Sequence, residues 1–171
     1  MMLKENLNVL EFFYPEAKNN NSLFKDLILT SPSADSPPEF YGTKMTAWKL
    51  QSPEIKNLIE WIKNIIIENI VPVSSLQCSE IWGAILNKEE YIDKHSHAPS
   101  AFSFVYYVNA PKGSSPLVFN TSGHKIKAET GKVIVFESRL DHHVPNNKCK
   151  NRYLLSGNFI HNKNTGVWVY K

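Results

Sequence analysis

The sequence is poor in cysteine and lacks a long apolar run. Its two cysteines, Cys78 and Cys149, form no CxxC pair, so we expect two reduced thiols in a cytoplasmic protein, with a bond between them as the alternative. The longest apolar segment, residues 59–73, is interrupted by charged residues and asparagines. Nothing in the chain is therefore expected to cross a membrane. The N-terminal residues resemble neither a signal peptide nor a transit peptide.

A strong imbalance of charge is also missing. The 171 residues carry a formal net charge of +3, and no run of Lys and Arg is interleaved with aromatic residues, which argues against a nucleic-acid partner. With 42% hydrophobic and 20% charged residues, the composition is that of an ordinary globular protein. The length suits a single domain, residues 1–171.

Within this domain the predicted secondary structure changes near residue 75. Residues 1–75 are predicted to form a helical and loop region that supports a β core at 76–171. Residues 19–43 are rich in Asn, Ser and Pro and are predicted to be mostly loop. A mobile flap over a site is the alternative interpretation of this segment.

One helix is predicted over residues 52–69. Ser52 is a favourable N-cap, and Pro53 suits the first helical position. Isoleucines and a leucine then recur at helical spacing on one broad stripe, and the helix is expected to end at Val71 and Pro72. A single apolar stripe predicts that the helix lies against a sheet.

Short strands separated by glycine-containing turns are predicted after residue 75. Their number and spacing indicate a β-sandwich or jelly roll rather than alternating βαβ units. The last strand would offer a sheet edge for a homodimer. The predicted strands span residues 80–86, 101–109, 116–120, 125–128, 132–136, 152–160 and 167–170.

Three histidines are placed so that they can meet. His95 and His97 form an H-x-H immediately before a predicted strand, and in an extended chain residues two apart project to the same side. Alternation along residues 136–144 directs His142 inward and His143 outward. Three imidazoles could then bind one metal ion, although single inward histidines are also found as ordinary core residues.

A basic residue is predicted to lie inside the β core. Arg152, Ser156 and Asn158 alternate on one face of their strand, opposite the apolar face that should pack under the helix. A buried guanidinium needs a partner, and a bound carboxylate suits its planar fork; a salt bridge to a nearby Glu or Asp is the alternative. Ser103 and Tyr107, which share a face of the strand 101–109, add hydroxyl groups that suit an organic acid.

These segments, in this order, resemble the superfamily of 2-oxoglutarate and Fe(II)-dependent oxygenases, in particular a branch of small bacterial and phage members. The similarity covers roughly residues 80–160, about half of the chain. It implies a protein that is mainly β with N-terminal helices, in which a double-stranded β-helix core (a cupin-like jelly roll) is braced by α-helix. The matching segments are WGAILN, HSHAPSAFSFVYYVN, GKVIVFESRLDHHVPN and RYLLSGN.

The same resemblance implies an activity and a set of site residues. Fe(II), 2-oxoglutarate and O₂ would hydroxylate a C–H bond of a small-molecule or peptidyl substrate, releasing succinate and CO₂. Activity is expected to fall below about pH 6.5, where ordinary histidines become protonated. The implied metal ligands are His95, His97 and His142, and the implied 2-oxoglutarate-binding residues are Arg152, Tyr107, Ser103 and Ser156.

The chain departs from the family pattern at two positions. His97 stands where most members carry a carboxylate ligand, and Glu137 stands where this branch commonly has proline. Asp93 or Asp141 could supply the missing carboxylate, the site could use three imidazoles, or it could be inactive.

Two other functions stay open. One is a three-histidine, cupin-type iron dioxygenase that does not use 2-oxoglutarate, and the other is a non-catalytic jelly-roll module that binds a sugar, a peptide or an acid. Trp48 and Trp82 are candidates for the substrate pocket, but core packing is the favoured interpretation of both.

Overall fold

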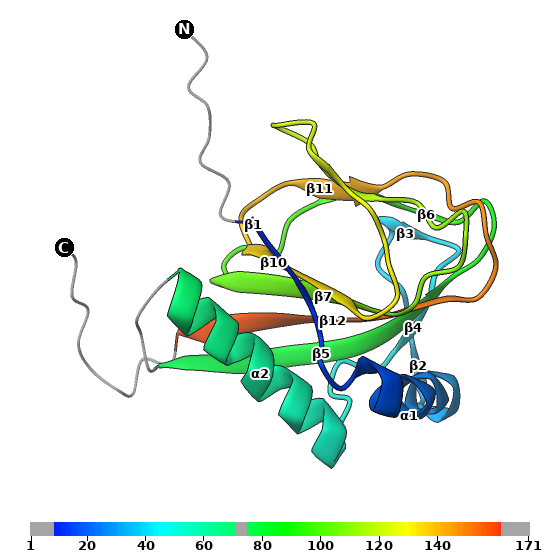
Figure 1. Cartoon of the computed structure of the whole chain (residues 1–171). Helices are drawn as coiled ribbons and strands as arrows, with labels where there is room; N and C mark the ends of the chain where they lie inside the picture. Colours follow the sequence, from blue (N-terminus) through cyan, green and yellow to red (C-terminus); the bar gives the residue numbers. More distant parts are fainter. Residues whose placement is uncertain (1–8, 71–74, 162–171) are drawn as a thin grey trace, which may run out of the picture.

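The computed structural model describes residues 9–70 and 75–161, and two antiparallel sheets form most of it (Figure 1). In chain order the elements are β1 (Val9–Phe13), α1 (Ala17–Thr30), β2 (Ser33–Ala34), β3 (Phe40–Tyr41), β4 (Lys44–Thr46), α2 (Pro53–Asn69), β5 (Leu76–Leu86), β6 (Tyr91–His95), β7 (Phe102–Asn109), β8 (Leu117–Phe119), β9 (Lys125–Ile126), β10 (Lys132–Glu137), β11 (His142–Val144) and β12 (Arg152–His161). The large sheet has the order β1-β10-β7-β12-β5-β4-β2, and the small sheet has the order β3-β6-β11-β8-β9.

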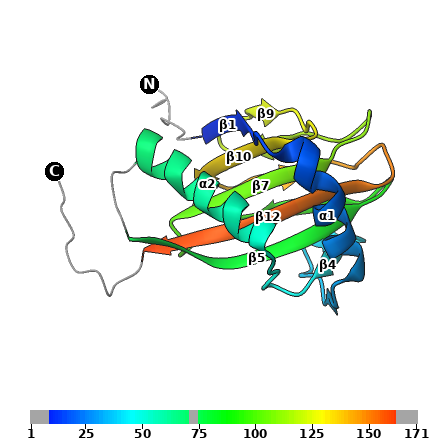
Figure 2. The ribbon, with the colours of Figure 1, turned by 60° about the horizontal axis from the view of Figure 1, so that its bottom comes forward.

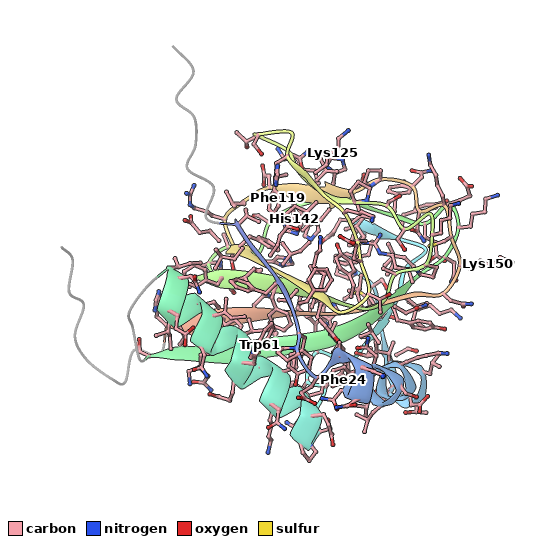
Figure 3. All side chains as sticks on the ribbon, viewed as in Figure 1. Phe24, Trp61, Phe119, Lys125, His142 and Lys150 are labelled. Atoms are coloured by element: carbon pink, nitrogen blue, oxygen red, sulfur yellow. The ribbon has the colours of Figure 1, made fainter. Side chains whose placement is uncertain are left out.

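The two sheets face each other, and both helices cover the outer face of the large sheet (Figures 1 and 2). Apolar side chains fill both interfaces: Phe24 and Leu58 pack beneath the large sheet, whereas Phe119 and Trp82 pack between the sheets. Figure 3 shows Phe24 on the helical side and Phe119 on the small sheet. The predicted architecture, a mainly β jelly roll braced by N-terminal helices, is confirmed.

Helix α2 begins where local signals predict. The Ser52 hydroxyl accepts a hydrogen bond from the Ile55 backbone N–H at 3.1 Å, and Pro53 occupies the first helical turn. The predicted apolar stripe is buried against the large sheet. The predicted end of the helix at Val71 and Pro72 lies outside the described residues.

The prediction that residues 19–43 are mostly loop is wrong for their first half, because α1 occupies Ala17–Thr30. Its asparagine-rich start has a weak helical propensity, and its first turn carries no acidic residue. Phe24 and Ile28, four residues apart, are nevertheless buried on the sheet. Tertiary packing therefore overrides the local composition.

Short strands from the first 75 residues extend both sheets: β1, β2 and β4 belong to the large sheet and β3 to the small one. The buried Lys132 secures β1, because its ammonium group lies 2.9 Å from Glu11 on that strand and 2.7 Å from Glu129. Strand β6 was missed because YIDKH has no apolar alternation. The predicted strand 167–170, with the dimer contact that it would offer, lies outside the described residues.

Two further expectations can be compared with the structure. Cys78 and Cys149 form no disulfide, as predicted. In the described part of the chain, neither helix is both long and apolar enough to span a membrane.

Helix α1 packs tightly against β5 at Gly83, where an added Cβ would lie 2.5 Å from Cγ1 of Ile28. We expect Gly83→Ala to lower the free energy of unfolding by about 1–3 kcal/mol, because the extra methyl group overpacks this contact. The Gly83→Ala/Ile28→Ala double variant should lose less than the sum of the two single losses, since the space is shared. Chemical denaturation measures all three, and strictly additive losses would contradict this packing.

Candidate metal centre

Three histidines converge between the two sheets. His95 ends β6, His97 follows two residues later, and His142 begins β11. His95 and His142 are directly opposite each other in the antiparallel pairing of β6 with β11. One nitrogen from each ring lies within 4.8 Å of the others. A single metal ion could therefore contact all three imidazoles.

Backbone carbonyl groups orient two of the rings. Nδ1 of His95 lies 2.8 Å from the Asp93 carbonyl oxygen, and Nδ1 of His142 lies 2.8 Å from the Leu140 carbonyl oxygen. A nitrogen that faces a carbonyl oxygen carries the proton, so the other ring nitrogen, Nε2, keeps a free lone pair. Both rings are thus held in the tautomer that can bind a metal through Nε2.

The surroundings favour neutral imidazoles. Burial and, after it, the neighbouring His95 lower the pKa of His142 to about 3 and that of His97 to about 4. Burial also lowers the pKa of His95, against the opposing effect of its hydrogen bond to the Asp93 carbonyl group. Only the neutral ring can bind a metal, so all three rings are prepared for coordination.

The alternation of faces expected along residues 136–144 is interrupted by a turn. β10 ends at Glu137, and the Leu140 N–H bonds back to the Glu137 carbonyl oxygen at 3.0 Å in a turn. The chain crosses from the large sheet to the small one at this turn, so alternation cannot be counted across it. His142 is still buried, with 3% of its surface exposed, because β11 lies between β6 and β8.

In the described part of the chain, no carboxylate joins the three histidines. Asp141 instead pairs with Lys94 at 2.8 Å, and the Asp93 side chain is exposed while its backbone carbonyl group holds His95. Glu137 lies 2.6 Å from Arg139. Both carboxylates that the sequence offered as alternatives to His97 therefore lie outside the cluster.

A narrow space, called here the inner cavity, extends from the histidines to the large sheet. It contains the predicted residues Arg152, Tyr107 and Ser156 and has mostly apolar walls. Its volume is about 30 Å³, room for about two water molecules. The residues that line it are Phe40, Trp82, Ile92, His95, His97, Val105, Tyr107, Leu117, His142, Val144, Arg152, Leu154 and Ser156.

Unsatisfied donors collect in this cavity. Arg152 is fully buried, and none of its three guanidinium nitrogens has a hydrogen-bond partner among the described residues. The Tyr107 hydroxyl and the Trp82 indole N–H are also buried without partners. The Arg152 guanidinium lies 5.2 Å from the centre of the Tyr107 ring, and burial raises the pKa of Tyr107, which keeps its hydroxyl protonated.

Ser103 is the one predicted site residue that the structure does not bring to the inner cavity. Its hydroxyl donates to Oδ1 of Asn158 at 2.8 Å and lies 2.7 Å from the Ser138 hydroxyl. Nδ2 of Asn158 donates to Glu80 at 2.9 Å. The residues form a chain of hydrogen bonds beside the cavity, and the sequence analysis did not consider Glu80.

A second space, called here the outer cavity, opens beyond His97. Its volume is about 400 Å³, and its lining includes His97, Trp48, Glu80, Ser100 and Asn158. Trp48 packs against Trp82 with ring centres 4.6 Å apart. Because His97 lines both cavities, a molecule in the outer cavity would lie next to the histidine cluster.

No protein-family model and no curated protein matches this sequence, but solved structures share its fold. A collagen prolyl hydroxylase of Paramecium bursaria Chlorella virus-1, in complex with 2-oxoglutarate, is 13% identical with a TM-score of 0.74 over 92% of this chain and 98% of its own. A Pseudomonas putida prolyl-4-hydroxylase is 16% identical with a TM-score of 0.72 over 92% and 94%.

A third structure, HygX from Streptomyces hygroscopicus with nickel, 2-oxoglutarate and hygromycin B bound, is 10% identical. Its TM-score is 0.73 over 93% of this chain and 85% of its own. At 10–16% sequence identity, these similarities establish the fold but not the activity or the substrate. The chain shares the double-stranded β-helix fold of these three proteins, two of which were solved with 2-oxoglutarate bound.

Proposed function

We propose that the chain is an Fe(II) and 2-oxoglutarate-dependent oxygenase. The observation that supports this most strongly is the buried, unpaired guanidinium of Arg152 in a cavity that ends at three histidines. An uncompensated buried charge costs several kcal/mol. A carboxylate of the ligand would remove this cost by pairing with the planar guanidinium fork.

The two ends of the inner cavity suit a 2-oxo diacid. Arg152 and the Tyr107 hydroxyl would bind one carboxylate, with Ser156 beside them, while the other carboxylate and the keto oxygen reach the metal. His95 and His142 would hold Fe(II) through Nε2, and His97 would hold it through one of its ring nitrogens. Three neutral imidazoles leave both positive charges of Fe(II) uncompensated, and the second carboxylate of the ligand would neutralise one of them.

Iron, 2-oxoglutarate and O₂ would together supply the oxidant, with succinate, CO₂ and a hydroxylated small-molecule or peptidyl substrate as products. The protein's own contribution is binding, orientation and exclusion of water. Apolar walls that include Ile92, Leu117 and Val144 limit the access of water to the inner cavity. At about 30 Å³, the cavity admits a five-carbon diacid only when these side chains move apart, a common adjustment on binding.

We also place the protein in the cytoplasm. Two cysteines without a disulfide support this compartment, because thiols stay reduced there.

Replacing a metal ligand should remove iron without unfolding the protein. We expect His142→Ala to weaken Fe(II) binding by at least about 100-fold, because removing a ligand costs more than removing its hydrogen-bond partner. The matched control is His143→Ala, one residue away on β11, where Nδ1 contacts Asn120 at 3.1 Å. Anaerobic Fe(II) titration measures both. Iron binding by His142→Ala equal to that of His143→Ala would remove His142 from the site.

Replacing Arg152 should weaken the binding of 2-oxoglutarate and increase the stability of the ligand-free fold. We expect Arg152→Met to lower 2-oxoglutarate affinity by about 100-fold, because the carboxylate loses its charged partner. The unfolding free energy of the ligand-free protein should rise by about 1 kcal/mol or more, because a buried unpaired charge is removed.

Anaerobic titration of the iron-loaded protein with 2-oxoglutarate, followed by the visible metal-to-ligand charge-transfer band, measures the affinity, and urea denaturation measures the stability. Arg139→Met, an exposed arginine paired with Glu137, is the control and should change neither. Unaltered affinity in Arg152→Met would rule out the carboxylate clamp. Bound iron without the band in wild type would indicate a three-histidine dioxygenase, and no bound iron would indicate a binding module.

Metal binding should persist to a lower pH than the ordinary histidine pKa of about 6.5 implies. Burial lowers the pKa of all three histidines, to about 4 for His97 and about 3 for His142, so protons compete with the metal at a lower pH than they would at ordinary histidines. We expect the affinity for Ni²⁺, which is stable in air, to change little between pH 7 and pH 5.5. Titrations in matched buffers measure it. If the Ni²⁺ affinity instead fell tenfold per pH unit for each histidine that takes up a proton, starting at about pH 6.5, the histidines would have unperturbed pKa values.

A further inference from the structure

The outer cavity carries one charge that the proposed metal and cosubstrate sites do not use. Glu80 and His97 are the ionisable residues in its lining. Glu80 makes no ion pair among the described residues, although the chain has 19 lysines and arginines. A carboxylate left without a cation beside a space of about 400 Å³ is available for a ligand's positive charge.

Glu80 is exposed, and a hydrogen bond from the buried Asn158 anchors its carboxylate to the residues beneath it. Asn158 donates to Oε2 of Glu80 at 2.9 Å, and Oδ1 of Asn158 accepts from Ser103 at 2.8 Å. Because the Ser103 proton is used in this bond, Ser138 donates to Ser103 at 2.7 Å. Asn158, Ser103 and Ser138 are all buried. Glu80 is thus oriented before any ligand arrives, and such preorganisation lowers the entropic cost of binding.

An aromatic side chain lies at the same cavity. Trp48 is half-buried and rests against Trp82, which in turn lies 5.9 Å from His97, measured between ring centres. An indole face attracts cations and also packs against the methylene groups that carry them. The cavity therefore combines a fixed carboxylate with an aromatic surface, next to the histidine cluster.

We propose that the outer cavity binds a substrate through a positively charged amine, with its ammonium group at Glu80 and its alkyl portion along Trp48. This assignment of the ligand as substrate rests on the proposed oxygenase function, which it refines to amine-bearing molecules. A neutral or anionic substrate of the same size would leave the Glu80 carboxylate without a counter-ion and would bind more weakly.

Three small probes of matched size test the proposal: n-butylammonium, n-butanol and butyrate. The four tryptophans give separate indole N–H signals in a ¹⁵N-correlation spectrum of the metal-free protein. We expect n-butylammonium to shift the Trp48 signal saturably, and the affinity to fall at least about tenfold in Glu80→Gln, since a charged partner is lost. Added salt should weaken the same binding. Equal affinity for all three probes, or unchanged affinity in Glu80→Gln, would overturn the cation site.

The control is Glu60→Gln, which makes the same change of charge at an exposed position on α2 and should leave the titration unchanged. Gln at position 80 can still accept the hydrogen bond from Asn158, so the fold should survive. The probes need neither iron nor 2-oxoglutarate, so the two proposals can fail separately. If the protein binds n-butylammonium but no iron, the proposed oxygenase function is overturned and the cation site is kept. If it binds iron but not n-butylammonium, only the cation site is overturned.

Discussion

The register of β12 is the constraint on which most of this structure depends. β12 pairs with β5 from Arg152 opposite Leu86 to His161 opposite Leu76, and its other edge pairs with β7. Alternation along this strand sends Leu155 toward the helices and Arg152 into the inner cavity. A shift by one residue would exchange the two faces. Helix packing and the position of Arg152 in the candidate site are therefore set by the same ladder of hydrogen bonds.

The candidate site exists only where the two sheets meet. The small sheet and the adjoining loop supply the imidazoles, and the large sheet supplies Arg152, Tyr107 and Ser156. Most buried polar atoms in folded proteins have partners, yet Arg152, Tyr107 and Trp82 leave theirs unpaired in one cavity. Such a concentration of unsatisfied donors is typical of a binding site, where stability is sacrificed for a ligand.

The sequence predicts best where the signal is local. Ser52 and Pro53 mark the start of α2 correctly, since capping needs only neighbouring residues. Helix α1 was missed because its stability comes from burying Phe24 and Ile28 on a sheet that no local pattern reveals. The turn after Glu137 was missed for a similar reason, because an alternating pattern does not show where a chain changes sheets.

The same distinction holds within the site. The H-x-H spacing and the position of Arg152, ten residues after His142, can be seen in the sequence, and the structure brings these residues to one cavity. Glu80 could have been noticed as a lone acid in phase with the inward-facing Trp82. Its contact with Asn158, 78 residues away, could not, since it depends on which strands become neighbours. Ser103 likewise bonds to Asn158 and does not line the inner cavity.

The Ser138 backbone joins two of the segments that carry histidines. Its carbonyl oxygen accepts from the His97 N–H at 2.7 Å, and its own N–H donates to the Ala101 carbonyl oxygen at 3.1 Å. The loop that bears His97 is thereby tied to the turn that leads into His142. The entropy of ordering these segments is lost when the protein folds, before any ion arrives. Metal binding would then not bear this entropic cost, which favours a high affinity.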